Sequence, residues 1–478
     1  MNFFDLLLKY THAIDQVIWG PAMIALLLGT GFYLTFKTGG IQFFNLKKAL
    51  QLTFSKESRT GKGAGDISPF AALMTALAAT VGNGNIAGVG TAIAIGGPGA
   101  PVFMWLAGIV GMATKYAEGY LGVKYRETAP NGTMAGGPMY YCKNGLKNKK
   151  LGKILGATFA FCGVTACLMG SGNMTQSNSM TVSLANTINQ WVTGHPEITL
   201  APTYYYFVIG GLIAFFVGLV IIGGIKKIGA VSERLVPTMI FFYVFFAMWV
   251  IIANFSEIPA AFVLIFKSAF GFQPLIGASV GMVVQSGISR GVLSNEAGLG
   301  SGAIAQGASN SEEPEKNGLI AMTGVFIDTI FVNTMTTLTI VLTGAYQKTQ
   351  AWQGMGATDN LTAILVTQEA FSSAIPGNLG SFVIAFASFL FGFTTLIGWA
   401  YYGEKCIEYL GGNKVINPFR YTFIFFLFLG AIITPLAGER FDYINIVWNL
   451  GNIGNALMAI PNLIGLLFLA KMVAEKKF

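Results

Sequence analysis

The stretch that decides the fold lies between residues 70 and 97, and its centre reads Ala79-Thr80-Val81-Gly82-Asn83-Gly84-Asn85-Ile86-Ala87-Gly88. The residues around this centre are apolar and numerous enough to cross a membrane, which takes about 20 residues of helix. Three glycines and two asparagines make the centre itself a poor helix. Unwound backbone is tolerated at such depth only where it is buried in protein or lines a cavity. The sequence therefore predicts a membrane helix that is interrupted at a cavity.

The composition of the whole chain points the same way. Only 10% of the 478 residues are charged and 53% are hydrophobic, whereas soluble domains carry roughly 25% charged residues. These values exclude a water-soluble enzyme, a secreted disulfide scaffold and a disordered protein. The 61 glycines and 16 prolines exclude a plain coiled-coil rod. The chain is predicted to be an all-α polytopic membrane protein. We therefore expect the lipid bilayer to be one of its partners.

Eleven segments are long and apolar enough to be membrane spans. They lie near residues 17–36, 70–97, 99–123, 153–190, 203–225, 231–253, 275–309, 318–345, 378–403, 418–436 and 446–471. The stretch 254–272 is expected to be a helix on the outer surface. The long loop 346–377 contains a second expected helix, Thr358–Phe371, which resembles a lid.

The basic residues predict which loops face the cytoplasm. If the amino terminus is outside, the cytoplasmic segments are 37–69, 124–153, 224–234, 290–316, 404–420 and the tail. These hold 24 of the 29 lysines and arginines, and cytoplasmic loops are the ones rich in such residues. The net charge of +8 thus reflects membrane orientation, and we expect no nucleic-acid partner. The predicted location is the cell membrane, with the carboxyl terminus in the cytoplasm.

A second span is interrupted like the first. Residues 285–291 read Gln-Ser-Gly-Ile-Ser-Arg-Gly, and residues 294–302 read Ser-Asn-Glu-Ala-Gly-Leu-Gly-Ser-Gly. Glycines in a span also permit close helix packing, but packing leaves the asparagine and glutamate unexplained.

The spacing of the two interrupted spans predicts an inverted repeat. Without the first span, ten remain, and an interrupted span begins each group of five. Because five is odd, the second group crosses the membrane in the opposite sense, an arrangement that marks the binding site of many transporters. We therefore divide the chain into an extra helix with a basic loop (1–69), a first repeat (70–253), a connector (254–274) and a second repeat with the tail (275–478).

Broken helices suit a zwitterion. One half-helix leaves free N–H groups that attract a carboxylate, and the other leaves free C=O groups that attract a cation or an ammonium group. A small neutral amino acid therefore fits a chain with few charged side chains in its spans.

Several motifs resemble the alanine/glycine:cation symporter family, which belongs to the amino acid-polyamine-cation superfamily. They are residues 75–89 around the first break, 96–100 with Met104-Trp105, 111–118, 136–141, 172–179, 290–301 and 398–404. The similarity covers nearly the whole chain. Residues 101–103 depart from the family pattern, at a helix entrance that affects little of the function.

The resemblance implies a sodium-coupled, in some members proton-coupled, importer of alanine and glycine. It also implies the five-plus-five inverted repeat of the leucine-transporter type with one extra amino-terminal helix. The sodium ion would be the coupling ion, and no organic cofactor is expected.

The candidate site residues follow from the breaks and the resemblance together. Substrate contacts are expected from Gly82, Asn83, Gly84, Asn85, Gln176, Leu293 and Trp399. Sodium contacts are expected from the carbonyls of Ala79 and Gly82 and the hydroxyls of Thr394 and Thr395, because hard oxygen ligands suit this ion. Gln176 can instead tie helices together, Trp399 and Leu293 can be ordinary packing, and threonine hydroxyls can bond back to their own helix.

Five charged residues lie in or near the spans. Asp328 is an intramembrane carboxylate, for which ion or proton handling and a paired structural role are both open. Arg290 and Glu296 are candidates for a pair at the cytoplasmic gate. Lys115 and Glu118 stand three residues apart and read as an ordinary helix-end pair.

The sequence gives less support to other classes of function. A passive channel usually needs symmetric rings or repeated carbonyl loops, and the two breaks in this chain are dissimilar. An enzyme is not expected, because there is no HExxH motif, nucleophile elbow or phosphate-binding loop. Secondary active uptake by alternating access remains the leading hypothesis, with proton coupling as the alternative to sodium.

Overall fold

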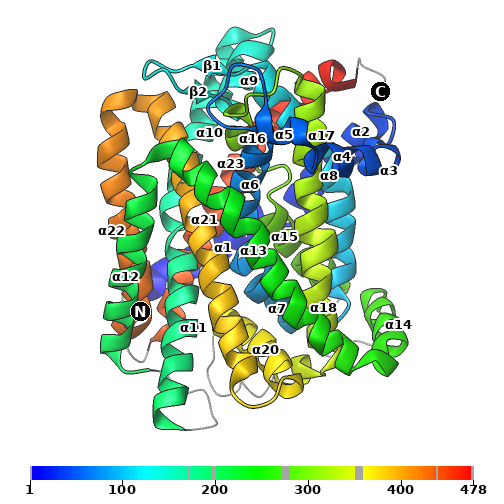
Figure 1. The fold of residues 1–478 in the computed structure, drawn as a ribbon, viewed down its shortest axis with the longest axis vertical. Helices are drawn as coiled ribbons and strands as arrows, with labels where there is room; N and C mark the ends of the chain where they lie inside the picture. The colour runs from blue at the N-terminus through cyan, green and yellow to red at the C-terminus, as the bar shows by residue number, and fades with distance from the viewer. Residues whose placement is uncertain are drawn as a thin grey trace.

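The computed structural model describes residues 3–170, 172–194, 201–271, 280–349, 359–437 and 440–474, with the backbone alone at 359–363 and 441. This part of the chain is a bundle of helices with one short hairpin, β1 (Glu127–Thr128) paired antiparallel with β2 (Met134–Ala135) (Figure 1). The all-α prediction is confirmed.

The helices fall into four groups along the chain. Before the first break lie α1 (Phe3–Ile18), α2 (Pro21–Lys37), α3 (Ile41–Phe44), α4 (Leu46–Thr53) and α5 (Lys56–Thr60). The range predicted as the first repeat contains α6 (Pro69–Thr80), η1 (Gly84–Gly88), α7 (Val89–Gly96), α8 (Ala100–Lys124), α9 (Pro138–Gly145), α10 (Lys149–Met169), α11 (Met174–Thr193), α12 (Thr203–Ile221) and α13 (Gly224–Ala253). The connector contains η2 (Phe255–Glu257) and α14 (Ile258–Ala269). The rest contains α15 (Val280–Asn295), α16 (Gly302–Gly307), α17 (Pro314–Val325), η3 (Phe326–Val332), α18 (Asn333–Leu342), η4 (Ala345–Lys348), α20 (Asp359–Ala374), α21 (Leu379–Gly411), η5 (Asn413–Val415), α22 (Ile416–Ala437), η6 (Phe441–Tyr443) and α23 (Ile444–Ala474).

Each of the eleven predicted ranges is mainly helical where it is described, with non-helical residues at the breaks near 81–82, 172–173 and 296–301; Ser171 and residues 275–279 lie outside the described residues. Within the described residues, eight helices are long and apolar enough to cross a membrane, or nine if α6 and α7 form one bent span. Helices α8 and α15 are not among them, although the sequence predicts spans in their ranges. Both pack inside the bundle against each other, so they contribute to the membrane domain without being uniformly apolar.

The first break is where the sequence predicts it. Helix α6 begins at Pro69 and is capped by Ser68, whose hydroxyl accepts the N–H of Ala71 at 3.1 Å. It ends at Thr80, and the axis bends by 53° before α7. The link is the π-helical turn η1, a feature frequent at functional sites.

The second break agrees with its prediction only in part. The sequence predicts interruptions at residues 285–291 and 294–302, and α15 continues through the first of these stretches to Asn295. Their glycines serve packing: a Cβ at Gly291 would lie 3.1 Å from the Cα of Met104. The interruption lies at residues 296–301, where Glu296, Gly298 and Gly300 have φ of 56°, 92° and 80°. Such values cost a residue with a side chain about 1–3 kcal/mol, so Glu296 is strained.

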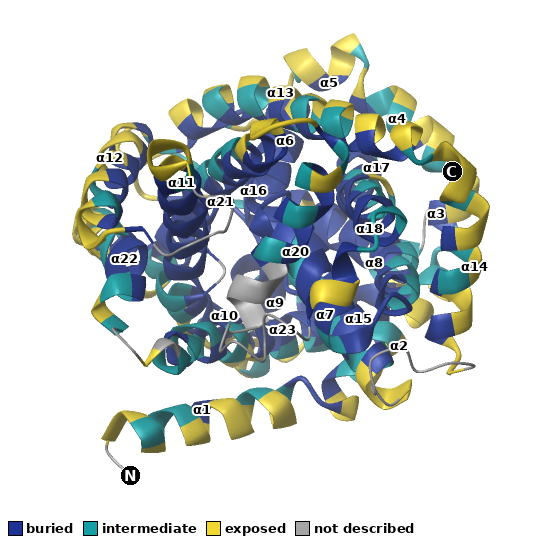
Figure 2. Ribbon diagram, turned by 90° about the horizontal axis from the view of Figure 1, so that it is seen from below, coloured by how far each residue is buried: buried dark blue, intermediate teal, exposed yellow. Residues whose placement is uncertain are grey.

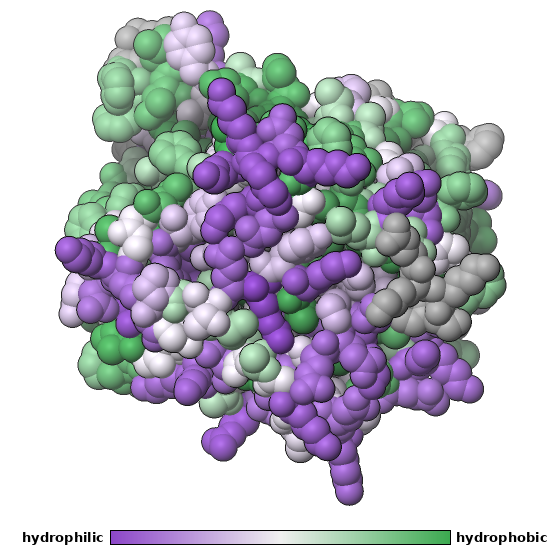
Figure 3. Space-filling model, turned by 90° about the horizontal axis from the view of Figure 1, so that it is seen from above, coloured by the Kyte–Doolittle hydropathy of each residue, from purple (hydrophilic) through white to green (hydrophobic). Residues whose placement is uncertain are grey.

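The predicted cytoplasmic segments gather at one end of the bundle. Helices α4, α5 and α9 and the β1–β2 hairpin lie together at the upper end of Figure 1, and we call this end the basic face. Figure 3 shows hydrophilic side chains spread across it. The prediction that 290–316 is a loop on this face is wrong for Arg290, which lies inside α15 on the other side of the second break.

The opposite end carries the two expected surface helices. Helix α14 packs on α8 and α18, and α20 packs on α7, η1 and α21. Both lie at the lower end of Figure 1. The predicted lid-like helix therefore exists, although Thr358 lies outside the described residues. The Thr367 hydroxyl donates to the Ile86 carbonyl at 3.0 Å, which fastens α20 to the first broken helix.

Burial divides the bundle into an inner set and a rim. Helix α6 is buried along its whole length, whereas α12, α13 and α22 expose large apolar side chains, such as Phe215, Phe241 and Phe425. Figure 2 shows buried surfaces turned inward and α1 along one edge with much of it exposed. Apolar exposure of this extent is rare on soluble proteins and fits a lipid-facing rim.

Candidate functional site

A cavity of about 60 Å³ lies between the two broken helices. Its walls come from α6, η1 and α7 on one side, α15 and the second break on another, and α11, α21 and α23 around them. The lining residues are Ala79, Thr80, Asn83, Gly84, Ala87, Gly88, Thr91, Thr175, Gln176, Arg290, Leu293, Ser294, Glu296, Trp399, Trp448 and Asn452.

Five predicted substrate residues line this cavity: Asn83, Gly84, Gln176, Leu293 and Trp399. The N–H of Asn83 donates to Oε1 of Gln176 at 3.3 Å, and its Oδ1 accepts the Ser388 hydroxyl at 2.7 Å. The Nδ2 of Asn83 is buried with no hydrogen-bond partner among the described residues. An unused buried donor beside a cavity is costly unless a ligand or water meets it.

Gly82 and Asn85 are not among the lining residues. Asn85 is fully buried, and its Oδ1 accepts the N–H of Gly82 at 2.8 Å. Its Nδ2 donates to Oδ1 of Asp328 at 2.7 Å and to Oδ1 of Asn333 at 2.9 Å. In this structure Asn85 ties the first break to η3, the second π-helical turn.

Asp328 is the centre of this network. Its Oδ2 accepts the hydroxyls of Ser294 at 3.0 Å and Thr329 at 2.7 Å. Because Ser294 lies near the end of α15 beside the second break and Asn85 follows the first, one buried carboxylate joins both breaks. The donors around its two oxygens provide the hydrogen bonds that a buried charge requires.

The predicted sodium residues also lie side by side. A methyl group at Gly82 would collide with the Thr395 hydroxyl, so these two residues are in close contact. A Cβ at Gly398 would lie 2.9 Å from the Cβ of Ala79, which shows how tightly α21 and α6 pack. Ala79 lies in the last turn of α6, where carbonyl groups have no partner within the helix.

The two threonine hydroxyls bond back to their own helix, the alternative that the sequence left open. Thr395 donates to the Phe391 carbonyl at 2.9 Å, and so does Thr394, also at 2.9 Å. A hydroxyl that donates its proton keeps two lone pairs, so this bond leaves Thr395 able to accept a cation. Thr394 also contacts the sulfur of Met239 at 3.3 Å.

Glu296 and Arg290 line the same cavity. Glu296 accepts hydrogen bonds from Ser301 and from the Trp399 side chain, while Arg290 interacts electrostatically with Asp15 of α1. A pair between Arg290 and Glu296 at the cytoplasmic gate stays a prediction; in the structure Arg290 lies on α15 and Glu296 begins the break that follows.

The interpretation of Lys115 and Glu118 as an ordinary helix-end pair is wrong. Both are buried on α8, with 4% and 0% of their surfaces exposed, and both bond to the backbone of the second break. Sequence spacing alone cannot separate such a pair from a solvated one.

Sequence reasoning did not name eight of the lining residues as site residues: Thr80, Ala87, Gly88, Thr91, Thr175, Ser294, Trp448 and Asn452. One signal was present for Asn452. It lies in Gly451-Asn452-Ile453-Gly454-Asn455, a glycine–asparagine pattern like that of residues 82–85, within an otherwise apolar span.

The chain is similar to known transporters over almost its whole length. It is 43% identical over 466 residues to the sodium/alanine symporter AgcS of Methanococcus maripaludis, covering 97% of this chain and 95% of the relative. It is 34% identical to the "Probable sodium/glutamine symporter GlnT" of Bacillus subtilis, over 96% and 87% of the two chains. The crystal structure of MhsT in complex with L-phenylalanine matches with a TM-score of 0.57 at 14% identity, over 87% of this chain and 98% of that one.

These comparisons confirm the predicted fold, an inverted repeat of the leucine-transporter type, and a secondary amino acid transporter rather than an enzyme. The model of the sodium:alanine symporter family matches residues 4–477. The chain is therefore a multi-pass membrane protein that belongs to the sodium:alanine symporter family.

Proposed function

We propose that this protein imports alanine, glycine or both by sodium symport through alternating access. The observation that carries the proposal is the cavity between the two breaks, with the Thr395–Gly82 contact directly beside it. A site held between inverted repeats can be exposed to either side of the membrane in turn.

The cavity suits a small zwitterion. Its volume of about 60 Å³ holds only a few water-sized groups, which matches alanine or glycine. The positive end of the helix that begins at η1 would attract the substrate carboxylate. Gln176, the unpartnered Nδ2 of Asn83 and the Glu296 carboxylate supply further polar contacts, while Leu293 and Trp399 limit the side chain.

The sodium ion would be carried between α6 and α21. The carbonyls of Ala79 and Gly82 lie at the negative end of the α6 dipole, and the Thr395 hydroxyl contacts Gly82. All are neutral oxygen ligands, which suit a hard monovalent cation. Thr394 is the weaker of the two predicted hydroxyl ligands, because its oxygen lies against Met239.

Proton coupling is the second candidate, and Asp328 is the observation that favours it. A carboxylate with no exposed surface, joined to both breaks, is a natural place for a proton inside a membrane. Under this alternative, Asp328 exchanges a proton in each cycle, and sodium is not required.

We also propose that the basic face is cytoplasmic and the amino terminus is outside, in the cell membrane. The support is that lysine- and arginine-rich segments gather at one end of the bundle. Cysteine labelling of a residue on α5, before and after permeabilising cells, tests it. Labelling of Thr60→Cys, at an exposed position of α5, without permeabilisation would show the opposite orientation.

The function itself is tested with purified protein in proteoliposomes. Labelled alanine uptake is measured with a sodium gradient alone and with a pH gradient alone. Accumulation driven by sodium at equal pH supports sodium symport, whereas accumulation driven by the pH gradient without sodium supports the Asp328 alternative. Equilibration without accumulation under both gradients would indicate a passive channel.

A further inference from the structure

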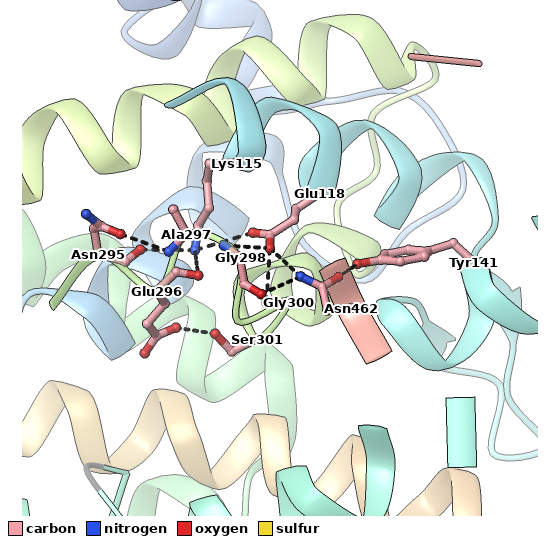
Figure 4. A network of polar contacts seen from close by, with 10 residues as sticks. All are labelled: Lys115, Glu118, Tyr141, Asn295, Glu296, Ala297, Gly298, Gly300, Ser301 and Asn462. Carbon is pink, nitrogen blue, oxygen red and sulfur yellow. Dashed lines mark hydrogen bonds and ion pairs between the residues drawn. The ribbon is translucent and has the colours of Figure 1, made fainter. Parts of the chain in front are cut away.

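The second break is held by two opposite charges from a helix that does not contain it. Lys115 and Glu118 lie one turn apart on α8, with Nζ and Oε2 3.9 Å apart. Figure 4 shows both side chains reaching the loop between α15 and α16. Since each charge is buried, each needs a partner that repays the loss of hydration.

Lys115 binds the end of α15. Its Nζ donates to the carbonyl oxygens of Asn295 at 3.2 Å and Glu296 at 3.4 Å. The last carbonyls of a helix have no partner within it and form the negative end of its dipole. A buried ammonium at this place therefore satisfies and neutralises the end of α15.

Glu118 binds the backbone that follows. Its Oε1 accepts the N–H groups of Gly298 and Gly300, both at 3.0 Å. It also accepts Nδ2 of Asn462 at 2.8 Å, and the same Nδ2 donates to the Gly298 carbonyl at 2.8 Å. The Tyr141 hydroxyl donates to Oδ1 of Asn462 and completes the network.

The first break is held differently. The N–H of Gly82 bonds Oδ1 of Asn85, and the N–H of Asn83 bonds Oε1 of Gln176. These partners are neutral amides, so the charges at the ends of α6 and η1 are not cancelled by them. The two breaks thus differ in electrostatics although they occupy corresponding positions in the repeats.

We propose that Lys115 and Glu118 are positioning residues that neutralise the second break and fix its backbone. The fixed backbone presents Leu293, Ser294 and Glu296 to the cavity. The first break, whose helix ends are not neutralised, then binds the charged groups of the substrate and the ion. This inference rests on the proposed transport function for its effect on rate. Its structural part, the holding of residues 296–300, is measurable without transport.

The variants separate charge from shape. Lys115→Met keeps the length of the side chain and removes the charge, and Lys115→Arg keeps the charge and can still donate to two carbonyls. The double variant Lys115→Met/Glu118→Gln removes both charges together, which is less costly than leaving one buried and unpaired. Lys405→Met is the matched control, because it removes one charge from another buried lysine–glutamate pair three residues apart, Lys405–Glu408 on α21, whose members do not line the cavity.

Transport kinetics give the first readout. Lys115→Met is expected to lower the maximal rate of alanine uptake about tenfold, while the sodium concentration for half-maximal uptake stays within about twofold. Lys115→Arg and the double variant recover part of the rate, and Lys405→Met stays near wild type. Lys115→Met at the wild-type rate, or a change confined to sodium affinity, would overturn the proposal.

Hydrogen exchange gives a readout that does not depend on transport. In detergent, Lys115→Met is expected to speed backbone exchange at residues 296–300 about tenfold and to leave residues 81–85 unchanged. If Lys115→Met does not yield folded protein, Glu118→Gln, which keeps an acceptor oxygen, is measured in its place. It should also speed backbone exchange at residues 296–300, by a smaller factor than Lys115→Met. Unchanged exchange at 296–300 in a folded variant contradicts the proposal. Absence of sodium-driven uptake by the wild type contradicts the proposed function alone.

Discussion

Asn85 and Asp328 connect the two π-helical turns of this transporter: Nδ2 of Asn85 lies 2.7 Å from Oδ1 of Asp328. Asn85 belongs to η1 at the first break, and Asp328 belongs to η3. The same carboxylate accepts Ser294 beside the second break. One carboxylate therefore contacts residues at both breaks.

Asn85→Ala should abolish alanine binding while the protein remains folded. The change removes the acceptor of the Gly82 N–H and a donor to Asp328, and each unmet buried group costs roughly 1–3 kcal/mol. The first break would then lose the geometry that binds substrate. Calorimetric titration of purified protein with alanine measures this loss.

Asn317→Ala is the matched control for Asn85→Ala. Asn317 is equally buried and donates to Gly119 and Gln306, away from the cavity. It should lower thermal stability and leave alanine affinity unchanged. Wild-type affinity in Asn85→Ala, or equal loss in both variants, would remove Asn85 from the binding mechanism.

Thr395→Ala should weaken the sodium dependence of uptake more than it lowers the maximal rate. The hydroxyl contacts Gly82, and its loss removes one oxygen ligand from the proposed ion site. Sodium titration of uptake checks this, with Thr339→Ala as control, since Thr339 bonds back to Met335 in the same way on α18. A sodium requirement equal to wild type would place the ion elsewhere.

Gly82→Ala should eliminate sodium stimulation more completely than Thr395→Ala does. The added methyl group would collide with the Thr395 hydroxyl and separate α6 from α21. Gly211→Ala on α12, where a Cβ meets nothing within 4 Å, should transport normally. Sodium-stimulated uptake by Gly82→Ala would show that this contact is not needed.

Trp399→Leu should widen the range of substrates. The indole is 2% exposed and lines the cavity, so a smaller residue leaves room for larger side chains. Alanine affinity should fall about tenfold, a loss of about 1.4 kcal/mol that lies within the roughly 1–3 kcal/mol by which an apolar pocket distinguishes side chains one methylene apart. Uptake of larger neutral amino acids should appear. Competition of labelled alanine uptake by valine and glutamine measures the change; Trp249→Leu, on the exposed surface of α13, should show none.

The spans, the first break and the α20 helix can be predicted from the sequence, because apolar length and proline and glycine signals are local. The second break cannot be located in this way, since glycine serves both unwound backbone and close packing. Gly291 lies against Met104 inside a continuous helix, whereas Gly298 has φ of 92° in the break itself. Only the position of a neighbouring helix separates these two uses.

The charged residues show the same limit. The spacing of Lys115 and Glu118 is typical of a solvated pair, and nothing local reveals that both contact residues 180 or more positions away. Asp328 is unusual in the sequence for its depth in a span, but its link to Asn85 depends on how η1 and η3 pack. Long-range contacts of this kind decide the site and leave no local pattern.

The most direct test of sodium symport is accumulation of labelled alanine in sealed proteoliposomes of the wild-type protein. With an inward sodium gradient and equal pH on both sides, internal alanine should rise well above the external concentration and fall back when the gradient is dissipated. Accumulation with an inward proton gradient in the complete absence of sodium would contradict sodium symport.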